Sequence, residues 1–170
     1  MHDADKKPPR PTYVVHVDQS YDSSLSRVAH HLLDDAERLL KGRVQIINVW
    51  KPIKTVRRDP LAVSQCQSVR EDDLVPIGVI YPQGGRMGAT LSVKYNEGQK
   101  WYYKSGMSPD EALLFKCFDS RAGAQGDPRL ENVAKRVPHS ACKIPGTEGE
   151  EERESIETRC LVFYDDDGGN

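Results

Sequence analysis

Short β-branched segments separated by proline and glycine constrain the fold of this chain more than any other feature. The clearest segment covers residues 43–50, whose valines and isoleucines favour extended backbone, and it stops at Pro52. Further candidate strands follow at residues 61–63, 74–81, 89–95, 137–142 and 156–164. Many short strands joined by turns predict a mainly β (α+β) domain such as a jelly roll.

One segment near the start has helical periodicity instead. Apolar side chains recur at helical spacing over residues 23–41, with Ser23 or Ser24 available as the N-cap and Gly42 as the stop. We therefore expect one N-terminal helix, with only short helical turns elsewhere. Residues 112–118 stay open at this point, because their apolar run suits a short helix and a buried strand equally well.

Length and charge bound the organisation and the partners of the chain. Its 170 residues suit one domain over residues 13–164, preceded by a flexible proline-rich leader (1–12) and followed by a disordered acidic tail (165–170). The 24 basic residues are dispersed among 26 acidic ones, which argues against a nucleic-acid or membrane surface and favours a small-molecule partner. No apolar stretch approaches the ~20 residues that span a bilayer, and no signal-peptide core is visible, so we expect a cytoplasmic protein.

The four cysteines show no paired spacing of the kind found in metal knuckles or redox motifs; they are Cys66, Cys117, Cys142 and Cys160. Without a secretion signal they are expected to be reduced and to serve in packing. A zinc site that combines them with His30 or His31 is an alternative that the sequence does not support.

The tripeptide His16-Val17-Asp18 lies in an extended run and is the first candidate for chemistry. Side chains two residues apart on a strand share a face, so His16 and Asp18 can hold one metal ion. A second imidazole from His139 would complete the two-His, one-carboxylate set that leaves Fe(II) with open positions for O2 and a chelating co-substrate. The alternative is a histidine and an aspartate that hydrogen-bond turn backbone at a strand end.

An anionic co-substrate needs a cation near such a metal. Arg153 and Ser155 share one face of an extended segment, where a guanidinium can bind a carboxylate bidentately and a hydroxyl can add one hydrogen bond. Arg159 has the same parity and competes for this role. For both arginines, the alternative is a surface cation balanced by the neighbouring glutamates.

Several blocks resemble one known family. In order along residues 13–164 they read HVDQS, GRVQIINVWKPI, DPLAVSQCQSV, DLVPI, KWYYKSGMSPDEALLFKCFDS, RVPHSACKIP and RESIETRCLVFY. They are similar to the fungal AsaB-like hydroxylase/desaturase family, to which CmcJ-like proteins are also similar. The resemblance implies a double-stranded β-helix (jelly-roll) core. It also implies a non-haem enzyme that uses Fe(II), O2 and 2-oxoglutarate to hydroxylate or desaturate a small secondary metabolite.

The resemblance also implies roles for individual residues. His16 and Asp18 match the proximal metal ligands and catalytic centre, His139 matches the distal ligand, and Arg153 with Ser155 matches the signature that holds 2-oxoglutarate. Two further blocks are expected in the walls of the substrate pocket, with core packing as the alternative. They contain Asn48, Trp50 and Lys51, where Lys51 replaces a more usual arginine, and Trp101, Tyr102 and Tyr103.

The chain departs from the family pattern in two places. Fifteen residues precede His16, whereas family members carry a substantial segment there, and the separation of His139 from Arg153 is longer than in most relatives. The jelly roll is therefore expected to be short at its start. Two alternatives follow: an inactive remnant with a binding or regulatory role, and an iron oxygenase that needs no 2-oxoglutarate. The substrate and the oligomeric state stay open.

Overall fold

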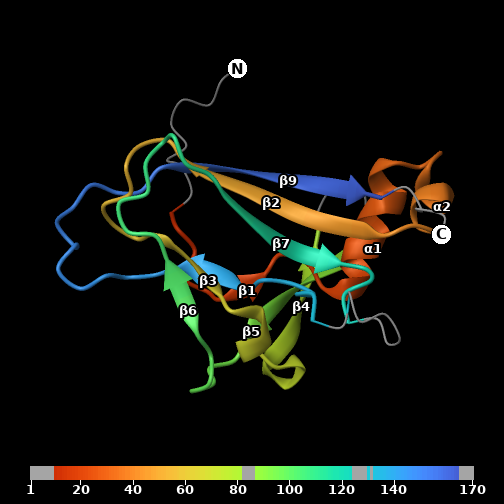
Figure 1. Ribbon diagram of the computed structural model, residues 1–170, viewed down its shortest axis with the longest axis horizontal. Helices are drawn as coiled ribbons and strands as arrows, with labels where there is room; N and C mark the ends of the chain where they lie inside the picture. Colours follow the sequence, from red (N-terminus) through yellow and green to blue (C-terminus); the bar gives the residue numbers. More distant parts are fainter. Residues whose placement is uncertain (1–9, 82–86, 124–129, 131, 165–170) are drawn as a thin grey trace.

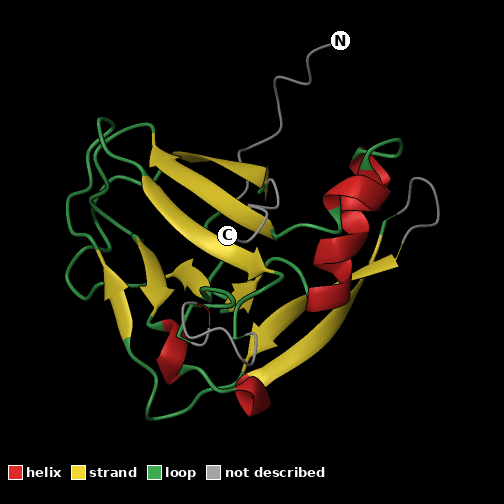
Figure 2. Ribbon diagram, turned by 45° about the vertical axis from the view of Figure 1, so that its right-hand side comes forward, coloured by secondary structure: helices red, strands yellow, loops and turns green. Residues whose placement is uncertain are grey.

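The computed structural model describes residues 10–81, 87–123, 130 and 132–164. Most of the predicted leader, residues 1–9, and the whole predicted tail, residues 165–170, lie outside the described residues. Within the described part, the strands form two antiparallel sheets that face each other, and the two α-helices lie together at one end (Figures 1 and 2). The prediction of a mainly β fold is therefore confirmed.

The larger sheet has six strands in the order β4-β5-β1-β8-β3-β6. They are β1 (His16–Val17), β3 (Leu61–Ser64), β4 (Leu74–Ile80), β5 (Met87–Val93), β6 (Trp101–Tyr103) and β8 (His139–Ala141). The short strand β1 lies between β5 and β8, and His16 pairs with both Ser92 and His139. This register places two histidines that are far apart in the sequence directly side by side.

The smaller sheet has three strands in the order β7-β2-β9, with bounds β2 (Val44–Pro52), β7 (Leu113–Asp119) and β9 (Ser155–Phe163). The central strand β2 is buried at most of its positions, and its Ile46 and Trp50 belong to the core together with Leu61 and Phe115. Residues 112–118, which the sequence left open, thus form most of strand β7. Their backbone pairs with β2, and Phe115, Cys117 and Phe118 enter the core. A β-bulge lies where Ile46 and Ile47 pair with β7.

The prediction of one continuous helix over residues 23–41 is wrong. The structure has α1 (Tyr21–His31), capped by the Ser20 side chain, which accepts a hydrogen bond from the Ser23 amide, and the separate four-residue α2 (Ala36–Leu39). Residues 32–35 between them include two adjacent aspartates, which favour turns over a helix interior. Short helical turns are present, but as η1 (Cys66–Ser68) and η2 (Glu71–Asp73), where the sequence predicted only a polar stretch.

A buried carboxylate anchors one end of the smaller sheet. Asp119 is 1% exposed and accepts hydrogen bonds from Arg43 Nη2 at 2.6 Å, Gln45 Nε2 at 2.7 Å and Lys116 Nζ at 2.7 Å. Burial alone would raise the pKa of Asp119, but the hydrogen bonds from Arg43 and Lys116 outweigh burial and hold this pKa below its ordinary value. The carboxylate therefore joins β7 to β2 as an ion.

Replacing this carboxylate with a neutral amide, Asp119→Asn, is expected to lower the free energy of unfolding by about 3 kcal/mol, because two partly buried cations lose their counter-charge. Urea denaturation at pH 7 measures the change. The exposed Asp110→Asn is the matched control and is expected to stay within about 0.5 kcal/mol of the wild type. Equal stability of the two variants would contradict the structural role of Asp119.

Candidate metal centre

Three predicted ligands converge where β1 lies beside β8. The ligand atoms of His16, Asp18 and His139 all lie within 4.8 Å of one another. Nε2 of His16 is 3.9 Å from Asp18 Oδ1, and Nε2 of His139 is 3.7 Å from Asp18 Oδ2. Among the described residues, His30 and His31 belong to no such cluster, so the alternative zinc site is not formed there.

Both imidazoles are oriented by backbone carbonyls. Nδ1 of His16 is 2.7 Å from the carbonyl oxygen of Val14, and Nδ1 of His139 is 3.2 Å from that of Val137. A carbonyl can only accept, so each Nδ1 carries a proton, and Nε2 is the ring nitrogen that faces Asp18 in both histidines. Outer hydrogen bonds that fix the tautomer in this way are typical of metal-binding histidines.

The ionisation states also suit a cation. Burial lowers the pKa of His139 to about 4, despite the nearby Asp18 carboxylate, so the imidazole is neutral at pH 7. Burial would raise the pKa of Asp18, but Arg159 and the adjacent hydrogen-bond donors outweigh burial, so this pKa lies below its ordinary value. The His139 imidazole and the Asp18 carboxylate are thus in the forms that bind a cation at neutral pH.

Asp18 is held by all three strands of the opposite sheet. Asn48 on β2 donates from Nδ2 to Asp18 Oδ2 at 2.8 Å, and the thiol of Cys117 on β7 donates to the same oxygen at 3.1 Å. Arg159 on β9 pairs through Nη2 with Asp18 Oδ1 at 2.7 Å. The larger sheet therefore supplies the three candidate ligands, and the smaller sheet orients the carboxylate among them.

The sequence did not indicate two of these contacts. Cys117 was expected to serve only in packing, and it reaches Asp18 because the bulge in the β2–β7 pairing changes the register beside it. Asn48 was expected in a pocket wall. A signal was present, because Asn48 is a polar residue at the inward parity of β2, between the buried Ile46 and Trp50.

The three candidate ligands share a cavity of about 540 Å³ with Arg153 and Ser155. The Arg153 guanidinium lies 5.3 Å from the Trp50 ring centroid, and its Nη1 donates to the Asp59 carbonyl at 2.7 Å. Its Nε is buried without a hydrogen-bond partner among the described residues. A half-buried cation with an unsatisfied donor is the kind of group that binds a carboxylate.

Arg159 is engaged differently from Arg153. Besides the ion pair with Asp18, its Nε donates to Asn48 Oδ1 at 3.1 Å, and its Nη2 lies 3.4 Å from Glu157 Oε1. Burial, followed by the charge of Asp18, raises the pKa of Glu157 above its ordinary value. The two arginines that sequence parity could not separate therefore face different partners.

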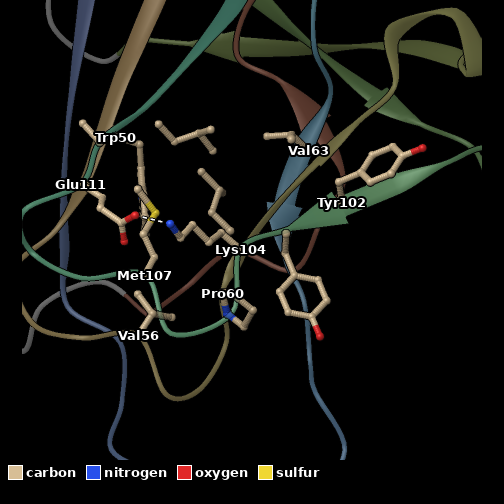
Figure 3. A pocket seen from close by; sticks show the side chains of 12 residues that line it. Trp50, Val56, Pro60, Val63, Tyr102, Lys104, Met107 and Glu111 are labelled. Carbon is tan, nitrogen blue, oxygen red and sulfur yellow. Dashed lines mark hydrogen bonds and ion pairs between the residues drawn. The ribbon is translucent and has the colours of Figure 1, made fainter.

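The predicted pocket-wall residues divide between several places. Trp50 and Tyr103, with Tyr102, line an apolar cavity of about 350 Å³ that also includes Val56 and Met107 (Figure 3). Leu61 lines both this cavity and the one at the metal centre. Lys51 is exposed on β2, and Trp101 is half-buried at the start of β6; neither is among the described residues that line these two cavities.

Comparison with known proteins identifies the family. The family model described as "Oxidoreductase/YMDC permease-like domain" matches residues 2–163. The chain is 42% identical over 165 residues to hydroxylase/desaturase efuI of Hormonema carpetanum, covering 92% of this chain and 53% of that relative. It is 44% identical over 165 residues to hydroxylase/desaturase CTB9 of Cercospora beticola, covering 92% of this chain and 48% of that relative.

The chain belongs to the fungal hydroxylase/desaturase family. It spans about half the length of the curated relatives it matches. A solved structure of the iron and alpha-ketoglutarate-dependent endoperoxidase NvfI superposes with a TM-score of 0.80 at 29% identity, covering 96% of this chain and 58% of that chain. The predicted family and the predicted jelly-roll fold class are thus confirmed. No helix among the described residues of this family member is long and apolar enough to cross a membrane.

Removing one imidazole tests the centre. The His139→Ala variant is expected to bind Fe(II) at least tenfold more weakly than the wild type, because one of three protein ligands is lost. An anaerobic titration with Fe(II), monitored by calorimetry, measures the affinity. His30→Ala, which changes an exposed helical histidine, is the matched control and is expected to bind as the wild type does. Equal loss in both variants would place the binding elsewhere.

Proposed function

We propose that the chain acts as an Fe(II)- and 2-oxoglutarate-dependent dioxygenase that hydroxylates or desaturates a small molecule. The observation that carries this proposal is the convergence of His16, Asp18 and His139 in one cavity with Arg153. Support also comes from the relatives named as hydroxylase/desaturase and from NvfI, whose name states dependence on iron and alpha-ketoglutarate.

The donor set fits ferrous iron. Nε2 of His16, Nε2 of His139 and one carboxylate oxygen of Asp18 would hold the metal and leave positions for other ligands. When bound, Fe(II) would activate O2 in a reaction that also oxidises 2-oxoglutarate to succinate and CO2. The three ligand residues would bind and orient the metal, while Asn48 and Arg159 keep the Asp18 carboxylate ionised and oriented.

Arg153 and Ser155 are proposed to bind the distal carboxylate of 2-oxoglutarate. The buried, unsatisfied Nε of Arg153 supplies a donor, and the guanidinium lies over the Trp50 ring, 5.3 Å from its centroid. Arg159 is the weaker candidate, because its guanidinium already neutralises Asp18 and donates to Asn48. In this assignment one arginine serves the co-substrate and the other serves the metal ligand.

The remaining expectations about partners and organisation stay predictions. A small-molecule substrate and O2 are the proposed partners, and the proposed domain covers residues 13–164 in a cytoplasmic protein that contacts neither nucleic acid nor membrane. The oligomeric state is open. An inactive remnant is not favoured, because the curated relatives are named as enzymes and the ligand atoms of the centre lie together.

Two arginine variants separate the assignments and test the function. Arg153→Leu is expected to weaken 2-oxoglutarate binding to the Fe(II)-loaded protein by roughly 10- to 100-fold with little change in Fe(II) affinity, since charged hydrogen bonds are lost. Arg159→Leu is expected to weaken Fe(II) binding instead, because Asp18 loses the cation that keeps its carboxylate ionised. Anaerobic calorimetry with each ligand in turn measures both, and the exposed Arg57→Leu is the matched control.

Formation of labelled succinate from labelled 2-oxoglutarate, with Fe(II), O2 and a panel of small molecules, then measures turnover. Wild-type turnover that is lost in His16→Ala is the expected result. Wild-type turnover that persists unchanged in His16→Ala, or full 2-oxoglutarate binding by Arg153→Leu, would contradict the proposed roles.

A further inference from the structure

Asp59 has an unusual backbone conformation. Its φ angle is +55°, and within the described part of the chain it is the one non-glycine residue with a positive φ. Aspartate enters this left-handed region more readily than most residues, but Pro60 follows it, and a residue before proline favours extended backbone. Asp59 is also only 7% exposed. Such a conformation persists where surrounding contacts enforce it, and it is common beside functional groups.

The carbonyl group of Asp59 contacts the arginine that is proposed to bind 2-oxoglutarate. Arg153 Nη1 donates to the Asp59 carbonyl oxygen at 2.7 Å, whereas Oδ2 of the Asp59 carboxylate accepts from Arg58 Nε at 3.3 Å. The main chain of Asp59 is therefore the part that is hydrogen-bonded to Arg153. Asp59 is not among the described residues that line the cavity at the metal centre, so it acts there only through Arg153.

The two neighbours of Arg153 in the sequence are ion-paired to the segment that leads to this left-handed residue. Glu154 pairs with Lys54 at 2.8 Å, and Glu152 pairs with Arg58 at 2.8 Å. Arg58 also donates through Nη1 to two backbone carbonyls of the same acidic loop, at 3.0 and 3.2 Å. Exposed ion pairs are individually weak, but a group of them on one short loop acts together. These contacts hold the two segments in place around the Arg153 side chain.

The anchored Nη1 leaves another donor of Arg153 for a ligand. Its Nε is buried without a hydrogen-bond partner among the described residues, and the guanidinium lines the cavity that contains the three candidate metal ligands. A guanidinium that is already oriented loses less side-chain entropy when a carboxylate binds to it. Extended backbone at Asp59 would turn the carbonyl away from Nη1, and Arg153 would lose this orientation.

We propose that Asp59 is a positioning residue, whose left-handed backbone directs a carbonyl oxygen onto Arg153 and so sets the preference of the site for a co-substrate with a distal carboxylate. This inference rests on the proposed function, in which Arg153 binds 2-oxoglutarate. The role belongs to the main chain of residue 59 and not to its carboxylate.

Two substitutions separate the backbone from the carboxylate. Asp59→Val and Asp59→Gly both remove the carboxylate, but glycine adopts a positive φ without strain, whereas a β-branched side chain opposes it. The Fe(II)-loaded wild type is expected to bind 2-oxoglutarate roughly tenfold or more tightly than 2-oxopentanoate, which has a methyl group in place of the distal carboxylate. Asp59→Val is expected to lose most of this preference, and Asp59→Gly to restore it. Anaerobic calorimetry measures the affinities.

The ratio of the two affinities does not depend on the fraction of protein that is folded, so a loss of stability alone would leave it unchanged. Asp110→Val, which introduces valine at an exposed aspartate, is the matched control and is expected to keep the wild-type ratio. A wild-type ratio in Asp59→Val, or an equal loss of the ratio in Asp59→Val and Asp59→Gly, would overturn the proposal.

A second measurement uses metal-free protein without any co-substrate. Phenylglyoxal modifies guanidinium groups, and peptide mass spectrometry reports the rate of modification at Arg153 separately. Release of Nη1 is expected to raise this rate roughly threefold or more in Asp59→Val relative to Asp59→Gly, since one hydrogen bond is lost. Equal rates would overturn the role of Asp59. If Asp59→Val does not fold, Asp59→Ala, whose methyl group opposes a positive φ less strongly, replaces it in both measurements.

The two measurements also separate this role from the proposed function. Failure of the Fe(II)-loaded wild type to bind 2-oxoglutarate would overturn the proposed function of Arg153 and, with it, the role of Asp59 in co-substrate preference. Binding of 2-oxoglutarate by the wild type, combined with unchanged ratios and unchanged modification rates in Asp59→Val, would overturn the role of Asp59 alone.

Discussion

The rest of the site depends on the hydrogen bonds and the ion pair that hold the Asp18 carboxylate. It projects from the end of β1 in the larger sheet, and it receives Asn48, Cys117 and Arg159 from the three strands of the smaller sheet. A charged group with partners on both sheets fixes their separation at this point. The same partners keep the carboxylate ionised in spite of its burial, which a divalent cation requires.

The cavity at the candidate metal centre presents a positive charge. It contains the candidate ligands with Arg153, a cation with an unsatisfied donor that suits a carboxylate.

Much of this arrangement could be predicted from the sequence. Period-two alternation alone places His16 and Asp18 on one face, and the β-branched run that forms β2 is visible from its composition. Sequence parity could not distinguish Arg153 from Arg159, since both share a face. The register does so, because Arg159 pairs with Asn48 and therefore lies beside Asp18. The bulge that brings Cys117 to the site and the break between α1 and α2 depend on tertiary pairing and turn preference, which local periodicity does not report.

His16, Asp18 and His139 are proposed to hold one metal ion. Anomalous diffraction at the iron edge, from crystals grown with Fe(II) under anaerobic conditions, tests it most directly. A single strong peak is expected within coordination distance of the two Nε2 atoms and an Asp18 oxygen. Absence of a peak there, or a peak that lacks one of the three side chains as a ligand, would contradict it.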